Sequence, residues 1–258
     1  MNILSIKNLT KSFGDKKIIN NLSFAIEQGK ILGLVGPNGV GKTTIINCIV
    51  DLLDFEEGEI KIFMSDIKGD AISIKKRMGI LFENNDDLFL KLKGEEHLQF
   101  VGEIYGLKSA AIEKRINELF NFFELNDDRN KIMEEYSKGM RKKIAFASVL
   151  LHDPEFIILD EPFDGLDTLT IIKIKKLLKQ LKEKGKTILI TSHILSYIED
   201  LADEVAIINK GKIVFRSETK LIRSKIKNEI TQETYKSLEE IFIDLTTEKE
   251  EEETLSWL

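Results

Sequence analysis

The chain has 258 residues and carries 44 acidic against 38 basic side chains, which gives a net charge of −6 with no dense basic cluster. That balance lacks the positive footprint of DNA- and RNA-binding proteins, so we expect no nucleic-acid partner, and no stretch approaches the roughly 20 consecutive apolar residues of a membrane-spanning helix. The single cysteine, Cys48, excludes an internal disulfide, and with three dispersed histidines it argues against structural zinc.

The first part of the chain predicts a small sheet followed by a buried strand. Residues 3–26 mix β-prone apolar residues with turn residues at Asn8 and Gly14–Asp15, as antiparallel strands joined by turns do. The apolar run Ile31–Val35 then leads into a glycine-rich turn and a helical pattern. This order is typical of a parallel strand in an α/β fold.

Two later apolar runs have the same character. Phe156–Leu159 is followed by Asp160–Glu161, and Thr187–Thr191 is followed by Ser192–His193. Open α/β sheets bind their ligands at the carboxyl ends of the strands, where helix N-termini also face. The sequence therefore predicts one ligand site at this edge of the sheet.

The remaining patterns are mainly helical. Between Leu92 and Leu151 the apolar residues recur at helical spacing, which predicts a helical insertion. Residues 173–184 carry lysines on the face opposite apolar residues, the pattern of an amphipathic helix that covers a sheet. Residues 205–209 and 213–215 predict a hairpin turning at Lys210–Gly211. We expect the acidic run 248–253 to be disordered or exposed, because concentrated like charge cannot bury itself.

A phosphate-binding loop follows the first buried run. Gly36–Thr43 satisfies the pattern GxxxxGK[ST] between a predicted strand and a predicted helix. Its backbone N–H groups would surround phosphate oxygens, and Lys42 would reach the β- and γ-phosphates. Thr43 would offer its hydroxyl to Mg²⁺ and Thr44 would contact a more interior phosphate; the competing interpretation is a glycine-rich turn without ligand. The predicted nucleotide-binding residues here are Gly36, Asn38, Gly39, Val40, Gly41, Lys42, Thr43 and Thr44.

The carboxylates after the second buried run have two predicted roles. Asp160 is placed to hold Mg²⁺, as the second acidic element of phosphate-loop enzymes does. Neighbouring side chains at a strand end point in different directions, so Glu161 can face the attacking water as a general base. In isolation, a turn or helix-capping cluster explains these residues equally well. The phosphate loop upstream favours the catalytic interpretation.

The histidines divide into one functional candidate and two others. His193 ends the run that should lie beside the one ending in Asp160, so its imidazole could contact the γ-phosphate and orient water. We expect His97 and His152 to lie on the surface, in the helical insertion and in a loop. Cys48 is spaced to face the core with its apolar neighbours.

These elements, in this order from Met1 to about Lys212, resemble the nucleotide-binding subunit of ABC transporters. The most specific part is Tyr136–Met140, which is similar to the family's signature motif in the form common among bacterial export cassettes. By itself, a serine and a glycine opening a helix are equally explained as an N-cap. The resemblance implies that Ser137 and Gly139 contact the γ-phosphate of ATP held by an opposite subunit, so that two chains share each site.

Other positions carry over from the family one by one. Phe13 resembles the aromatic residue that stacks on adenine, with a strand-core aromatic as the alternative. Asp167, in Gly165–Leu166–Asp167, resembles the loop that couples the two sites. Glu83 aligns with a position where the family usually has glutamine that contacts Mg²⁺ and ATP, and a carboxylate there adds negative charge. Lys138, beside the partner's ATP, and Thr168 also depart from the family pattern.

The resemblance implies a fold and a division of the chain. We expect an α/β phosphate-loop NTPase (RecA-like) core with an N-terminal antiparallel β-subdomain and a helical insertion. The ABC ATPase domain would span 1–215, with the core and β-subdomain in 1–83 and 151–215 and the helical subdomain in 84–150. Residues 216–258 would form an extension with an acidic tail, in which 237–242 resembles the terminal segment of export-type cassettes.

The resemblance also implies partners and an activity. Two copies, or one copy and a related cassette, would close around two Mg-ATP, hydrolyse them and drive an integral membrane permease from the cytoplasmic side of the cell membrane, for export of a drug, peptide or polymer. The permease would dock near Glu83, where apolar residues are available, although a core role explains half of them equally well. These residues are Phe82, Leu88, Phe89, Leu90 and Leu92.

Three alternatives stay open. The nearest is an ABC ATPase that serves assembly, repair or translation without a permease. A phosphate-loop kinase would lack the Ser137–Gly139 element and Glu161. The third is a nucleotide-gated binding module with negligible turnover, which the departures at Glu83 and Lys138 would suit.

Overall fold

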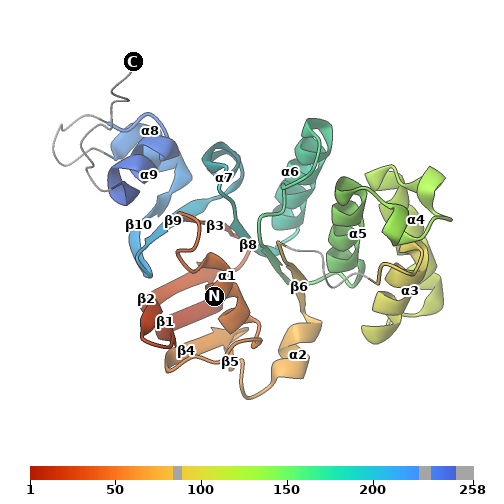
Figure 1. The fold of residues 1–258 in the computed structure, drawn as a ribbon, viewed down its shortest axis with the longest axis horizontal. Coiled ribbons are helices and arrows are strands. Elements are labelled where there is room, and N and C mark those ends of the chain that lie inside the picture. The colour runs from red at the N-terminus through yellow and green to blue at the C-terminus, as the bar shows by residue number, and fades with distance from the viewer. Residues whose placement is uncertain (84–88, 227–233, 248–258) are drawn as a thin grey trace.

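The computed structural model describes residues 1–83, 89–226 and 234–247, which form two sheets and the helices around them (Figure 1). The smaller sheet has four strands in the order β2-β1-β4-β5. Its strands are β1 (Asn2–Phe13), β2 (Lys16–Glu27), β4 (Glu57–Ile62) and β5 (Ser65–Asp66). The predicted N-terminal antiparallel sheet is confirmed, and β4 extends it by pairing antiparallel with β1.

The larger sheet has six strands in the order β10-β9-β3-β8-β7-β6. Its strands are β3 (Ile31–Val35), β6 (Met78–Leu81), β7 (Phe156–Leu159), β8 (Thr187–Thr191), β9 (Glu204–Asn209) and β10 (Lys212–Glu218). The pairs of β3, β6, β7, β8 and β9 are parallel. The three predicted buried strands and the final hairpin are confirmed. Lys210 and Gly211 turn that hairpin with φ angles of 47° and 75°.

The helices divide into those beside the sheet and those at the two ends of the molecule. They are α1 (Lys42–Ile49), α2 (Ala71–Lys76), α3 (Gly94–Ile104), α4 (Ser109–Phe123), α5 (Lys138–Leu151), α6 (Thr168–Glu183), α7 (Leu195–Leu201), α8 (Thr219–Lys225) and α9 (Leu238–Thr246). In Figure 1, α3, α4 and α5 gather at one end, whereas α8 and α9 lie at the other. The predicted helical insertion is confirmed, with α5 beginning two residues earlier than the expected Met140. Among the described residues, no helix is long and apolar enough to cross a membrane.

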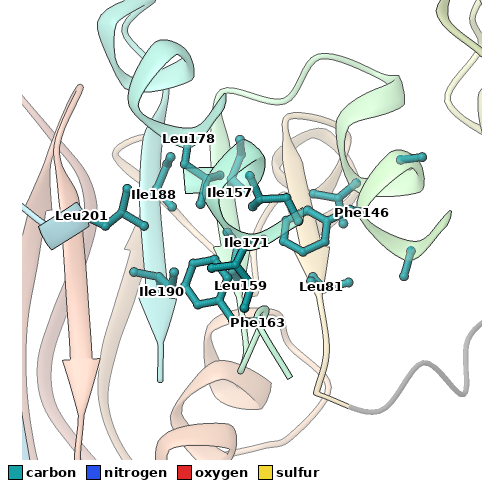
Figure 2. Packing of buried hydrophobic residues seen from close by; sticks show 14 of the residues in the cluster. Leu81, Phe146, Ile157, Leu159, Phe163, Ile171, Leu178, Ile188, Ile190 and Leu201 are labelled. Carbon is teal, nitrogen blue, oxygen red and sulfur yellow. The ribbon is translucent and has the colours of Figure 1, made fainter. Parts of the chain in front are cut away.

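The core lies on both faces of the larger sheet. Ile157 and Leu159 face the side covered by α5 and α6, where Figure 2 shows Phe146, Phe163 and Leu178 packed around them. Ile158 faces the opposite side, toward α1 and the smaller sheet. Residues of β3, β7 and β8 are buried without exception because both faces are covered. This burial fixes the strand ends at which the candidate site lies.

Cys48 lies in the core between the larger sheet, α1 and the smaller sheet, as expected, and burial raises the pKa of its thiol to about 11. The surface prediction for His97 is wrong, because His97 is only 3% exposed. It lies on the inner face of α3, where its Nε2 is 3.1 Å from Ser148 Oγ, and burial lowers its pKa to about 4. His152 departs from the prediction more mildly: it is half-buried at the end of α5, stacked on Tyr105 with 3.7 Å between ring centroids.

Two further expectations fall at the edges of the described structure. The acidic run 248–253 and Leu88 lie outside the described residues. Segment 237–242 forms the start of α9, where Ser237 is the N-cap and Leu238 and Ile241 join the core against α7.

Candidate functional site

A cavity of about 480 Å³ opens at the carboxyl ends of β3, β7 and β8, where the sequence predicts the ligand site. It is lined by residues from every predicted element of that site: Phe13, Ile18, Asn38, Gly39, Gly41, Lys42, Thr43, Thr44, Glu83, Asp160, Glu161, Asp164 and His193. Most of these residues were selected from the sequence. Ile18 and Asp164 were not.

The loop from Gly36 to Gly41 joins β3 to α1 and forms the floor of the cavity. Gly41 has a φ of 108°, and a Cβ there would lie 2.9 Å from Ile18 Cγ2, so only glycine suits the turn. A Cβ on Gly36 would meet the Ile208 carbonyl oxygen at 2.6 Å. The side chain of Val40 does not line the cavity, and its backbone N–H donates to the Pro37 carbonyl. The loop therefore takes this shape through close backbone packing.

Lys42 begins α1 and is buried beneath the loop. Its Nζ donates to the Gly36 carbonyl at 2.8 Å and to the Pro37 carbonyl at 3.3 Å. These bonds hold the ammonium in the cavity, next to the N-terminus of α1. A positive charge together with a helix N-terminus is an arrangement that binds phosphate.

Asp160 is fully buried and is fixed by hydroxyl groups on both carboxylate oxygens. Thr43 Oγ1 donates to Oδ2 at 2.9 Å, and Thr191 Oγ1 donates to Oδ1 at 2.6 Å. A hydroxyl and a carboxylate side by side are the oxygen ligands that Mg²⁺ prefers, so the residues present fit that ion. The sequence reasoning did not single out Thr191, although its place at the end of a buried strand was a usable signal.

Glu161 and His193 form a second pair beside Asp160. Glu161 Oε2 lies 2.9 Å from His193 Nδ1 and also accepts the His193 backbone N–H at 3.1 Å. Because a carboxylate only accepts, the side-chain contact requires the proton on Nδ1 and leaves Nε2 for a ligand. Glu161 has a φ of 44°, an uncommon conformation for a residue other than glycine. Strained backbone of this kind clusters at active sites.

Asp164 extends this pair into a polar cluster. Its Oδ1 lies 3.9 Å from His193 Nδ1, and ligand atoms of Glu161, Asp164 and His193 all lie within 4.8 Å of one another. In the sequence, only its spacing of three residues after Glu161 pointed to Asp164. The cluster gives the cavity groups that can accept and orient protons.

The rim of the cavity carries the two residues assigned by resemblance. Phe13 is 52% exposed, with Lys11 Nζ 5.3 Å from the centre of its ring, so the alternative of a strand-core aromatic is wrong. Glu83 is exposed and also lines the cavity, after β6. An exposed aromatic face at the mouth of a phosphate-binding cavity can stack on a base.

The remaining predicted residues do not line this cavity. Ser137, the N-cap of α5, accepts the Met140 backbone N–H at 3.2 Å, and both Ser137 and Lys138 are exposed. Gly139 packs on the loop before α6, where a Cβ on it would lie 3.0 Å from the Gly165 carbonyl oxygen. Asp167 caps α6, and its bonds from the Thr170 hydroxyl and backbone N–H hold the pKa of its carboxyl below the usual value.

A buried lysine near the site also escaped the sequence reasoning. Lys142 is 1% exposed, and its Nζ donates to the Glu83 carbonyl at 3.1 Å. Its position on the apolar stripe of α5, with Phe146 and Val149, was the signal that could have identified it.

Comparison with known proteins agrees with this geometry. The sequence pattern described as "ABC transporter" matches residues 19–164. The ABC transporter ATP-binding protein NatA of Bacillus subtilis is 35% identical over 218 residues, which cover 83% of this chain and 89% of NatA. The Nod factor export ATP-binding protein I of Ralstonia nicotianae is 34% identical over 212 residues, or 81% of this chain and 65% of that protein.

A solved structure titled as the ATP-binding subunit of an ABC transporter superposes with a TM-score of 0.86 at 28% identity, covering 95% of this chain and all of that one. The structural similarity and the sequence similarity therefore point to the same family. This chain belongs to the ABC transporter family, as an ATP-binding subunit.

Proposed function

We propose that this chain hydrolyses Mg-ATP as part of a two-cassette dimer and drives a separate membrane permease in export. One observation carries the catalytic part of the proposal: the Thr43–Asp160 pair and the Glu161–His193 pair line the same cavity as Lys42. A phosphate-binding cation, a pair of Mg²⁺ ligands and a general base are then within reach of one γ-phosphate.

Each residue of the cavity has a role in this reaction. Lys42 neutralises charge on the β- and γ-phosphates, and the loop amides with Thr44 hold the phosphate chain. Thr43, Asp160 and Glu83 would hold Mg²⁺, which neutralises the charge that develops on the phosphate oxygens. Glu161 accepts a proton from the attacking water, and His193, oriented by Glu161, contacts the γ-phosphate. Phe13 stacks on adenine.

The dimer completes the site from the other side. Ser137 and Gly139 lie at the N-terminus of α5, outside the cavity of their own chain, and a helix N-terminus binds anions. Their position supports a site in which they contact the ATP of the opposite subunit, next to the loop carrying Asp167. Whether the opposite subunit is an identical chain or a related cassette does not change this chemistry.

The docking surface for the permease lies on α3 and the segment before it. Phe89 is 50% and Phe100 41% exposed, and their rings meet edge to face at 5.3 Å, with Ile104 exposed on the same helix. Leu90 and Leu92 instead pack on the core. The relative named for Nod factor export supports the outward direction, and docking on a permease implies a peripheral position on the cytoplasmic side of the membrane.

We propose the division of the chain that the sequence predicts. Residues 1–215 form the ATPase domain, with 84–150 as its helical subdomain, and residues 216–258 form an extension. β10 continues to Glu218, and α9 packs on α7 and β9, so the described part of the extension rests against the ATPase domain.

The reaction is tested by measuring phosphate release from the purified chain with ATP and Mg²⁺. Glu161→Gln should bind ATP and release phosphate at least about 100-fold more slowly, because a neutral amide cannot take the proton. Unchanged turnover removes Glu161 from this role, and no turnover in the unaltered chain favours a binding module.

The permease is tested by pull-down of the tagged chain from detergent-solubilised native membranes. The unaltered chain should bring down a multi-span membrane protein, and the double variant Phe89→Ser, Phe100→Ser should lose it. Ile72→Ser, at a 75% exposed residue of α2, is the matched control and should keep it. Recovery without a membrane protein favours an ABC ATPase that works without a permease.

A further inference from the structure

Lys142 is a charged side chain inside the protein, between α5 and the nucleotide cavity. It is 1% exposed, and its Nζ donates to the carbonyl oxygens of Glu83 at 3.1 Å and Phe82 at 3.4 Å. Both carbonyls belong to the segment that leaves β6 and brings Glu83 to the rim of the cavity. The side chain therefore ties α5 to that segment.

Burying a lysine at this position lowers the stability of the fold unless other groups compensate its charge. The neighbouring positions on the same stripe of α5 are the apolar Phe146 and Val149, and a methionine has nearly the same length as lysine. Carbonyl oxygens replace part of the lost hydration but leave a full positive charge in a buried place. Burial accordingly lowers the pKa of Lys142 below its ordinary value.

The cavity has a matching excess of negative charge. Among its lining residues, four carry carboxylates, Glu83, Asp160, Glu161 and Asp164, whereas Lys42 alone carries an ammonium. Asp164, Asp160 and Glu83 act on Lys142 in the direction opposite to burial, since each carboxylate favours its protonated form. Lys138 is the charged group that opposes them. Lys142 thus lies in the field of the carboxylates that surround the predicted phosphates.

We propose that Lys142 is a positioning residue that supplies the countercharge for Glu83, so that this chain binds Mg-ATP with a carboxylate where a neutral amide would be expected. The proposal rests on the nucleotide site described above. The ammonium of Lys142 orients the backbone of Glu83. It also offsets the repulsion between the Glu83 carboxylate and the phosphates.

This arrangement also links two parts of the site mechanically. Ser137 caps the same helix five residues before Lys142, less than two turns away. A shift of α5 that moves Ser137 also moves the tie to Glu83. The segment facing the partner's nucleotide and the rim of the chain's own cavity are then held by one rigid helix.

The test is a double-mutant cycle of Lys142→Met and Glu83→Gln, measured by equilibrium binding of Mg-ATP. Lys142→Met should weaken binding about tenfold when Glu83 is present and less than about threefold when residue 83 is glutamine, because the charge to be offset is then gone. An equal loss in both backgrounds overturns the countercharge role, since a purely structural tie to the backbone carbonyls would persist with glutamine.

Controls separate this result from misfolding and from loss of surface charge. Lys176→Met removes an exposed lysine of α6 and should change binding less than about twofold. All chains are assayed below the lowest unfolding midpoint. If Lys142→Met does not fold, Lys142→Gln repeats the cycle with a neutral donor. An unaltered chain that binds no Mg-ATP rejects the nucleotide site itself, whereas binding without coupling rejects only the role of Lys142.

Discussion

Two regions carry the candidate site, and they are built differently. In the cavity every key group is held by another: Asp160 by two hydroxyls, Glu161 by His193 and Lys42 by the loop carbonyls. At the start of α5, Ser137 is exposed, and within the described part of the chain its hydroxyl bonds to the backbone of its own helix. The first region is assembled in a single chain. The second has the exposed N–H groups of a helix N-terminus, which can bind an anion.

The difference follows from burial. The cavity groups lie at the ends of strands covered on both faces, where a low dielectric strengthens each bond and leaves little room for alternative positions. The start of α5 lies at the surface, where an approaching second chain can reach it. A site that forms only between two chains needs this combination of one fixed half and one open half.

The largest effect expected is on the fixed half. Lys42→Met should weaken ATP binding by the isolated chain at least about 100-fold, because a charge-assisted contact to phosphate in a desolvated site is lost. Ser137→Asp should change the same binding less than about threefold, since the cavity of its own chain is intact. Equilibrium titration of both variants measures this, and similar losses in the two would contradict the contrast.

Mixing these two variants tests whether the open half serves the other chain. Each variant alone should hydrolyse ATP at a small fraction of the unaltered rate, and aspartate preserves the N-cap while its charge repels phosphate. A one-to-one mixture should regain up to about a quarter of that rate, because half of random dimers contain one intact composite site. A mixture no more active than its components argues that each chain works alone.

Much of this site was predictable because the signals were local. The apolar runs 31–35, 156–159 and 187–191 end in polar residues, so their burial and their ligand-facing ends could be predicted together. β4 was not predicted, although Glu57–Ile62 alternates charged and apolar residues as a half-buried strand does. Its pairing with β1, which lies far away in the sequence, could not be read from local pattern.

The residues that the sequence reasoning missed depend on contacts between distant segments. Thr191 matters because β8 lies beside β7, and Lys142 because α5 packs against the segment after β6. His97 was assigned to the surface for the same reason, since its spacing on α3 did not reveal that α5 covers that face. Local sequence patterns identify candidate polar residues, whereas the packing of distant segments determines which of them contact one another.

The folded chain should lose stability in acid because of His97. Its pKa is about 4 in the folded chain, well below the usual 6.5, so between these values the unfolded chain binds a proton that the folded chain does not. The unfolding free energy should therefore fall as the pH drops from 6.5 to 4, by up to about 3 kcal/mol from this residue.

Denaturant unfolding at several pH values measures that fall, and His97→Gln should flatten it while keeping a polar contact to Ser148. His152→Gln is the matched control and should flatten it less, because the bond of His152 to the Met78 carbonyl partly offsets the effect of burial on its pKa. Parallel curves for His97→Gln and the unaltered chain would show that this histidine does not set the acid sensitivity.

The smallest expected effect is on two serines that both cap a helix, of which only one is proposed to act in the site. Ser137 caps α5 and Ser237 caps α9, each by accepting a backbone N–H three residues on, at 3.2 and 3.3 Å. Either serine changed to alanine should lower the unfolding free energy by about 1 kcal/mol, the usual value of an N-cap. Only Ser137→Ala should also slow phosphate release, by about tenfold, because its hydroxyl alone is proposed to meet a phosphate. Equal turnover in the two variants would reduce Ser137 to a cap and leave the open half of the site without its main ligand.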